Sequence, residues 1–419
     1  MPLSAPAPPA SPPPPKPRRK VVVGVLAAVI AAMLVVLGVV ILLRPGAVSE
    51  PVPSDVAPLY VSPTGRDGND GATAATPLAT IQAALEKATP GTVVNLAPGV
   101  YHEQPSTVRD GAPGAPITIQ GPETGTDRAG RYQAVVHGTG RIFNIDHSWI
   151  TLRGFTVDGQ EQLVDTELPT DLATIDAFKQ RVQDRVEDGR LVYLGSSEST
   201  RDVTGVTIDD MFLHGGGGEC VRLRNNAHDN TITNSVIQYC GMYGKGGDDG
   251  EEEAERAEFH NGEGVYIGTS PKSEDQPMAA NDESARNVVQ GNVIRTFGSE
   301  CFNVKENAHS NVFEDNVCSS NAESAEYEGS TVELRGHDNV VRNNEIADSL
   351  GYLIKIQSDD ESYDRGGNAV ENNRMSGSAA EIFKVKSSAT QGRMCGNQVD
   401  SATLFNDDGE TLSGVTSPC

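Results

Sequence analysis

The chain has 419 residues, enough for one large domain or two ordinary ones. Aromatic residues make up only 5% of it and there are 44 glycines, a composition that suits many short strands and tight turns and disfavours a helical bundle. The net charge is −25, and residues 1–44 carry five basic side chains and no acidic one, so the remainder carries −30. We therefore expect no nucleic-acid partner.

The N-terminal residues predict a membrane anchor. A disordered, Pro-rich cytoplasmic tail over residues 1–20 ends in Arg18-Arg19-Lys20, and residues 21–43 follow without a charge. This run is long enough to span a bilayer as a helix, and the basic cluster before it places the N-terminus in the cytoplasm. Residues 44–58 form a Pro-containing stalk, so the remaining chain lies outside the cell. A cleaved signal peptide is the alternative, because residues 47–49 are loosely cleavage-like.

The next segment predicts a strand, a helix and a second strand. Residues 59–62 read as a short strand, a helix begins after Thr76-Pro77 with Leu78, Ile81, Leu85 and Ala88 on one face, and residues 92–96 form the second strand. This order resembles the opening of secreted right-handed parallel β-helix proteins of the pectate-lyase-like superfamily. The resemblance implies an all-β, right-handed parallel β-helix solenoid in which this helix caps the open end of the coil.

A repeat with a period in the twenties supports the solenoid. Strand-like segments recur at 117–119, 134–137, 142–145, 150–152, 155–157 and 206–208. Asparagines then pair at a fixed offset: Asn287/Asn292, Asn311/Asn316, Asn339/Asn344 and Asn368/Asn373, with Asn397 continuing the second column in steps of 24, 28, 29 and 24 residues. We expect these amides to bond to the backbone and to one another inside the coil, as a structural ladder.

The β-helix is expected to occupy residues 59–400, followed by a C-terminal tail over 401–419. Residues 160–190 interrupt it with apolar residues at helical spacing, which predicts an amphipathic helix inserted between coils and packed on their flank, or a lid. Longer loops at 241–258, 269–286 and 319–329 are expected to leave one side of successive coils and to wall a groove.

Six cysteines in an extracellular chain indicate disulfides, with fifteen possible pairings. Cys301 and Cys318 flank one coil, and Cys220 and Cys240 flank another in the same way. Cys395 and Cys419 remain and would fasten the C-terminus.

Two columns of charged residues mark a candidate site. Overlaying the coils stacks Glu219, Glu263 and Glu300, and five residues later a second column contains Arg224, Gly268, Lys305, Arg335, Gln357 and Lys386. Adjacent coils lie about 4.8 Å apart, so Lys305 and Arg335 should be neighbours on the outer face. Repulsion between two cations this close favours loss of the lysine proton, which would make Lys305 a general base.

A second resemblance concerns this column. Glu300-Cys-Phe-Asn-Val-Lys305, and Leu334-Arg335-Gly336 one coil later, resemble the strands of the calcium-dependent polysaccharide lyases that include chondroitinase B and alginate lyases. The resemblance implies that Lys305 removes the C5 proton of a uronate, that Arg335 assists, and that Ca²⁺ held by Glu300 neutralises the substrate carboxylate. The family has a second Glu where this chain has Gly298, and we expect Glu263 to replace it. Arg224, Lys386 and His337 would contact the substrate.

Other interpretations stay open. Stacked Lys, Arg and Glu side chains can form only an ion-pair ladder, which would leave a non-catalytic glycan-binding or envelope-surface protein. The pairs Asp209-Asp210 and His214-Gly215 allow a polygalacturonase-like hydrolase. The preferred hypothesis is a membrane-anchored extracellular β-helix that acts on or binds polysaccharide, with β-elimination as its most specific activity.

Overall fold

The computed structural model describes residues 56–122, 132–195, 201–243, 262–273, 276, 278–323, 328–377, 382–400 and 414–419. The predicted cytoplasmic tail, the apolar run 21–43 and most of the stalk lie outside these ranges, as do most of the predicted loop 241–258 and residues 401–413. Within the ranges, no helix combines the length and the apolar character needed to cross a membrane.

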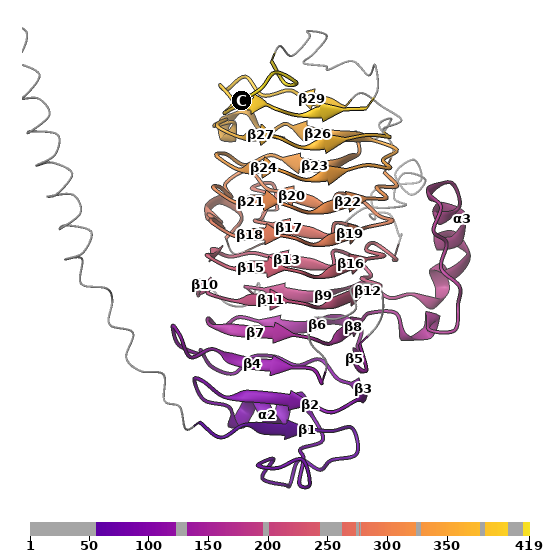
Figure 1. The fold of residues 1–419 in the computed structure, drawn as a ribbon, viewed down its shortest axis with the longest axis vertical. Coiled ribbons are helices and arrows are strands. Elements are labelled where there is room, and N and C mark those ends of the chain that lie inside the picture. Colours follow the sequence, from indigo (N-terminus) through magenta and orange to yellow (C-terminus); the bar gives the residue numbers. More distant parts are fainter. Residues whose placement is uncertain are drawn as a thin grey trace, which may run out of the picture. The chain divides into compact units, whose positions relative to one another are not determined.

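Three long parallel sheets run along the stack of coils (Figure 1). Sheet A contains β1 (Leu59–Val61), β2 (Val93–Leu96), β4 (Ile117–Gln120), β7 (Ile150–Arg153), β11 (Thr207–Asp209), β15 (Thr231–Thr233), β18 (Val288–Gln290), β21 (Val312–Glu314), β24 (Val340–Arg342), β27 (Ala369–Glu371) and β30 (Met394–Cys395). Sheet B contains β3 (Gly99–His102), β5 (Ala134–His137), β8 (Thr156–Asp158), β12 (Phe212–His214), β16 (Val236–Gln238), β19 (Val293–Arg295), β22 (Val317–Ser319), β25 (Glu345–Ile346), β28 (Arg374–Met375) and β31 (Gln398–Val399).

Sheet C contains β6 (Gly140–Ile145), β9 (Gly189–Leu194), β13 (Val221–Leu223), β17 (Val265–Ile267), β20 (Phe302–Val304), β23 (Ser330–Leu334), β26 (Tyr352–Ile356) and β29 (Phe383–Val385). Two short strands, β10 (Val203–Thr204) and β14 (Ala227–His228), pair separately. From β6 onward the chain visits the three sheets in turn, apart from this pair, and each strand pairs with its equivalent one coil away. The predicted parallel β-helix solenoid is therefore confirmed.

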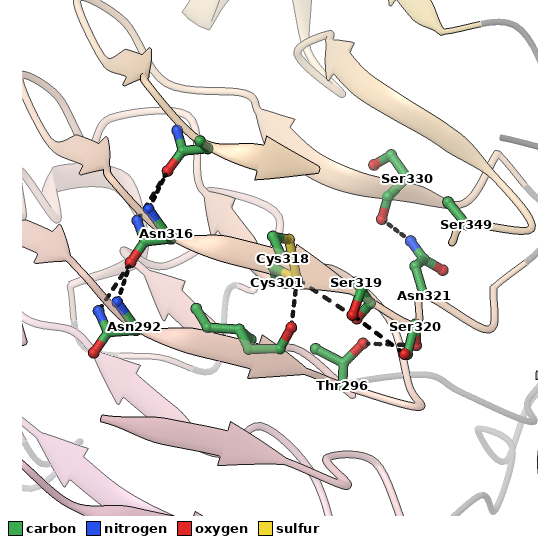
Figure 2. Close-up of a disulfide and its surroundings, with 12 residues drawn as sticks. Asn292, Thr296, Cys301, Asn316, Cys318, Ser319, Ser320, Asn321, Ser330 and Ser349 are labelled. Carbon is green, nitrogen blue, oxygen red and sulfur yellow. Dashed lines mark hydrogen bonds between the residues drawn. A yellow bond between two sulfur atoms is a disulfide. The ribbon is translucent and has the colours of Figure 1, made fainter. Parts of the chain in front are cut away.

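The inside of the coil is apolar because alternate strand residues point inward. Phe302 of sheet C stacks on Phe313 of sheet A with ring centroids 4.8 Å apart, and both are fully buried. At the corner between sheets A and B, the predicted asparagine ladder is present. Asn316 donates to the Asn344 side chain at 3.1 Å and to the Val289 carbonyl at 2.9 Å. Figure 2 shows Asn292 bonded to Asn316, and the same side-chain bonds continue to Asn397.

The first helix, α2 (Ile81–Lys87), begins later than predicted. The Thr80 side chain accepts a hydrogen bond from the Ala83 amide and so fixes the N-terminus of the helix. Leu78, expected in the helix, instead forms a parallel bridge with Val61. Ile81 and Leu85 are buried in the same core as the first strands, so the helix covers the beginning of the coil stack.

Residues 160–188 form the insertion that the sequence predicted. It contains α3 (Leu172–Val182) with short 3₁₀ turns η1 (Glu161–Leu163) and η2 (Gln183–Arg185) on either side; two further turns, η4 (Ala279–Asn281) and η6 (Glu361–Tyr363), lie in later loops. Ile175, Phe178 and Val182 of α3 belong to one buried apolar cluster with Tyr239 and Phe297 of the coils. The helix therefore packs on the flank of the β-helix (Figure 1).

All three predicted disulfides are present: Cys220–Cys240, Cys301–Cys318 and Cys395–Cys419. The last one holds residues 414–419 against the final coil. Gly396 and Asn397 donate backbone hydrogen bonds to Ser417 and Val415, and the Asn397 amide also donates to Val415. The end of the chain thus satisfies the last asparagine of the ladder.

Candidate functional site

The outward face of sheet C carries the charged columns that the sequence predicted. Pairing of β20 with β23 sets Phe302 opposite Val332 and Val304 opposite Leu334. Lys305 and Arg335, which directly follow the second pair, are therefore equivalent positions on adjacent coils, as predicted. The pairing of β13, β17 and β20 likewise aligns Glu219, Glu263 and Glu300.

Lys305 lies at the centre of this face and is 7% exposed. Its ammonium nitrogen is 4.8 Å from the centroid of the Tyr266 ring. With the residues that the structure describes, the ammonium group forms neither an ion pair nor a hydrogen bond. Burial and Arg335 lower the pKa of Lys305, but Tyr266, Glu333 and Glu263 together outweigh them and raise it above its usual value. The expectation of a depressed lysine pKa is wrong, because acidic neighbours outnumber the one cation.

Arg335 forms ion pairs with three carboxylates. Its Nε atom lies 3.0 Å from Glu333, it contacts Asp359 closely, and Glu306 is 4.0 Å away. Burial lowers the pKa of Arg335, but the three carboxylates raise it well above its ordinary value. Arg335 is therefore a fixed cation whose charge is largely balanced within the protein.

The pKa values of the three glutamates Glu219, Glu263 and Glu300 are shifted in different directions. Burial would raise the pKa of Glu219, but Arg222 and Arg190 hold it at about 2, so Glu219 is ionised. Burial raises the pKa of Glu263 to about 8, and the neighbouring Glu219 and Glu300 add to that effect. Burial and Glu333 also raise the pKa of Glu300. The close carboxyl groups of Glu263 and Glu300 would be stabilised by a bound cation or by a shared proton.

The residues around Glu300 are held firmly. The adjacent Cys301 is in the disulfide with Cys318, and Ser330 Oγ lies 3.5 Å from Oε1 of Glu300. The Asn321 amide in turn donates to the Ser330 carbonyl, as Figure 2 shows beside the disulfide. The disulfide thus anchors the backbone directly after Glu300, and Ser330 contacts the Glu300 carboxylate.

A metal site is not complete in the described part of the chain. No group of three or more His, Cys, Asp or Glu side chains in those ranges is placed to hold a metal ion. Oε2 of Glu263 is nevertheless buried without a hydrogen-bond partner there. Glu263 and Glu300 supply oxygen donors of the kind that a hard cation prefers, but fewer than Ca²⁺ needs.

The three predicted substrate-binding residues have protein partners. Arg224, in the Lys305 column, donates to the Gln276 side chain at 2.9 Å. Lys386 pairs with Glu328 at 3.0 Å. His337 lies beyond the end of the sheet C strand, bonded to Asp338 at 2.9 Å. Arg224 and Lys386 share the face with Lys305, whereas His337 sits at its edge.

The prediction missed a second outward column, two residues before the Lys305 column. Its members are Tyr193, Arg222, Tyr266, Asn303, Glu333, Lys355 and Lys384, aligned by strand pairing. Lys355 and Lys384 are paired with Glu333 and Glu328. Strand alternation would have found this column, since residues two apart point to the same side.

Long connections flank sheet C on both edges. The expectation that they leave only one side of successive coils is therefore wrong. The segments between β8 and β9, β16 and β17, and β22 and β23 join sheet B to sheet C. The segment between β17 and β18, however, joins sheet C to sheet A. Sheet C is therefore the sheet that the long loops border.

The residues suggested for a hydrolase do not meet on one face. Asp209 ends a strand of sheet A and accepts hydrogen bonds from Thr233 and Asn234. Asp210 bonds to the Tyr132 hydroxyl, and His214 belongs to sheet B. Their separation removes the pattern on which that alternative rested.

Comparison with known proteins gives a likeness of fold. No protein-family model matches the chain. It is 45% identical over 62 residues to the uncharacterized protein YwoF of Bacillus subtilis (strain 168), a match that covers 15% of this chain and only 13% of that relative. The crystal structure of an alginate lyase from Paenibacillus sp. str. FPU-7 matches 78% of this chain and 95% of its own, with a TM-score of 0.55 and 21% identity. Pectate lyase Pel9A matches 85% of this chain and 81% of its own, with a TM-score of 0.48 and 15% identity.

Proposed function

We propose that this chain is a membrane-anchored extracellular β-helix protein that binds an anionic polysaccharide over sheet C and cleaves it by β-elimination at a uronate. The observation that carries the proposal is the state of Lys305. Among the described basic side chains on this face, it alone has no ion pair, hydrogen bond or other polar partner. The acidic neighbours Glu333 and Glu263 keep this buried ammonium charged without pairing with it directly, so its hydrogen-bond donors remain available to an external anion.

The reaction class follows from what such a cation can do. The C5 proton of a uronate becomes acidic when the neighbouring carboxylate is neutralised. The Lys305 ammonium, with Arg335 on the next coil, supplies positive charge at one point of the face. Lys305 and Arg335 are therefore our proposed catalytic pair, and Arg224, Lys386 and His337 remain candidates for contacts along the polymer.

We also propose that Ca²⁺ contributes through Glu263 and Glu300. The orphaned Oε2 of Glu263 and the raised pKa values of both carboxyl groups suit a cation between them. A bound calcium ion would supply further neutralisation of the substrate carboxylate. Water and substrate oxygens would complete its coordination.

The location is proposed from the sequence and supported by the disulfides. Residues 21–43 would anchor a single-pass protein with a cytoplasmic N-terminus. Three disulfides favour an oxidising environment for the β-helix.

A second candidate is non-catalytic binding of an anionic glycan. The raised pKa of Lys305 favours it, because a protonated lysine binds a carboxylate but removes no proton. In this case the face would hold the polysaccharide without cleaving it.

One experiment separates the two candidates. A soluble piece from residue 59 onward is incubated with alginate, pectate and chondroitin-type glycans, with Ca²⁺ or chelator, and the ultraviolet absorbance of unsaturated uronate is followed. Absorbance that depends on the protein and disappears in Lys305→Ala supports the lyase. If every glycan stays uncleaved but one is retained by the wild type and released by Lys305→Ala, the binding function replaces it. If none is cleaved or bound, both are wrong.

A further inference from the structure

We propose that Tyr266 is the residue that removes the C5 proton, with Lys305 as its acid partner. This inference rests on the β-elimination proposed above. It starts from a gap in that reaction: Lys305 holds its proton and Arg335 is tied to three carboxylates, so neither is prepared to accept a proton. The reaction therefore needs another group on this face that can accept the C5 proton.

The Tyr266 ring lies between two cations from neighbouring coils. On one side the Arg222 guanidinium carbon is 4.5 Å from the ring centroid, and on the other the Lys305 ammonium is 4.8 Å from it. Strand pairing sets Tyr266 directly beside Arg222 and beside the neutral Asn303. Two positive charges on either side stabilise a negative phenolate between them.

Two of the acidic groups nearby are paired with basic side chains, and a third carries a raised pKa. Glu219 is bound by Arg190 at 2.5 Å and by Arg222 at 2.8 Å. Glu333 is bound by Lys355 and Arg335. Glu263, which contributes to the raised pKa of Lys305, carries a raised pKa itself. Of the two cations beside the ring, Arg222 shares its charge with Glu219, and Lys305 is the one without a direct ion pair in the described ranges.

The Tyr266 hydroxyl is free to meet a substrate. It forms no hydrogen bond within the described ranges and is not among the polar atoms buried without a partner. Tyr193, two coils earlier in the same column, differs in this respect. Arg141 lies 4.0 Å from its ring centroid, but its hydroxyl is fully buried with no hydrogen-bond partner. Tyr193 is thus a matched tyrosine in the same column, with an arginine over its ring but with a hydroxyl that no ligand can reach.

The proposed step balances without a further reactant. The Tyr266 phenolate takes the C5 proton, and the C5–H electron pair forms the C4=C5 double bond. The C4–O bond breaks, its electron pair goes to the leaving oxygen, and the Lys305 ammonium protonates that oxygen. The Tyr266 phenol then returns its proton to the Lys305 amine, which restores the starting forms.

The test compares Tyr266→Phe with Tyr193→Phe on the most rapidly cleaved uronate glycan. We expect Tyr266→Phe to lower kcat by about 100-fold or more while KM changes little, because acid–base groups contribute about that factor. Tyr193→Phe should keep kcat. Replacing Tyr266 by a fluorinated tyrosine, which is a more acidic phenol, should move the pH profile of kcat/KM to lower pH than in the wild type. The fluorinated variant also serves if the phenylalanine variant folds poorly.

The outcomes are distinguishable. Wild-type cleavage that Lys305→Ala abolishes and that folded Tyr266→Phe retains would overturn the role of Tyr266 and leave the lyase intact. An unmoved pH profile in the fluorinated variant would do the same. A wild-type protein that cleaves no uronate glycan would overturn both the lyase and this inference.

Discussion

Oε1 of Glu333 lies 2.9 Å from Nζ of Lys355, and the two side chains, on the directly paired strands β23 and β26, are 1% and 5% exposed. Burial acts against both charges, yet Arg335 and Lys355 hold the pKa of Glu333 far below its usual range. Lys355 is likewise kept charged, mainly by Glu333. The charged face of sheet C is therefore part of what holds adjacent coils together.

Removing Lys355 should be strongly destabilising. Lys355→Ala leaves Glu333 buried with less compensation, and breaking a buried pair in this way costs about 3–5 kcal/mol of unfolding free energy. Urea unfolding measures the loss. Arg393→Ala is the control, because Arg393 is 70% exposed in its pair with Glu371 and should cost at most about 1 kcal/mol. Equal losses in the two variants would contradict the structural role.

The asparagine ladder should contribute to stability at each step. Asn316→Ala removes hydrogen bonds to Val289 and Asn344 and leaves buried groups of Asn292 without an acceptor. Each unsatisfied buried group costs about 1–3 kcal/mol, so urea unfolding should report a loss in that range or above it. Gln398→Ala, at an exposed strand position, should change little. A neutral Asn316→Ala would show that the ladder is not needed.

The Cys301–Cys318 disulfide closes a loop with a sequence separation of 17. For a loop of this size the chain-entropy model gives about 3 kcal/mol. The double variant Cys301→Ala/Cys318→Ala should lose about that amount in urea unfolding, and added reductant should then have less effect on it than on the wild type. A double variant as stable as the wild type would refute this estimate.

Stability should fall with rising pH because of Glu263. Burial, Glu219 and Glu300 raise its pKa from 4.5 to about 8, so between these values the folded protein keeps a proton that the unfolded chain has lost. The contribution is complete below pH 4.5 and is lost as pH rises toward 8, by up to about 1.4 kcal/mol per pH unit. Urea unfolding at pH 5.5 and 7.5 should show that the unfolding free energy of Glu263→Gln falls less between the two pH values than that of the wild type. An equal loss of unfolding free energy in the two proteins would exclude Glu263 as the source of the pH dependence.

Calcium should act on the same carboxylates. If Ca²⁺ binds between Glu263 and Glu300, it stabilises the folded state by mass action and displaces their protons. At pH 7.5, Tm should rise with Ca²⁺ relative to chelator in the wild type and stay constant in Glu263→Gln. A Tm that responds to Ca²⁺ equally in both proteins would place the ion elsewhere.

The sequence by itself determined the features that repeat with the coil. The asparagine spacing predicted the ladder, the overlay of Val304 on Leu334 predicted the strand register, and the cysteine positions predicted all three disulfides. These predictions succeeded because a solenoid places each residue beside its equivalent one period away. Position in the repeat then fixes the neighbour.

Only the tertiary structure decided the chemistry of the face. Asp359, which follows the sheet C strand β26 of the next coil, binds Arg335. Glu333 and Glu263 raise the pKa of Lys305 although Arg335 is next to it. The start of α2 and the position of Tyr266 between Arg222 and Lys305 were likewise not predicted. The reason is physical: protonation and ion pairing depend on burial and on the sum of all nearby charges. That sum includes side chains from other columns and from loops whose lengths do not follow the repeat.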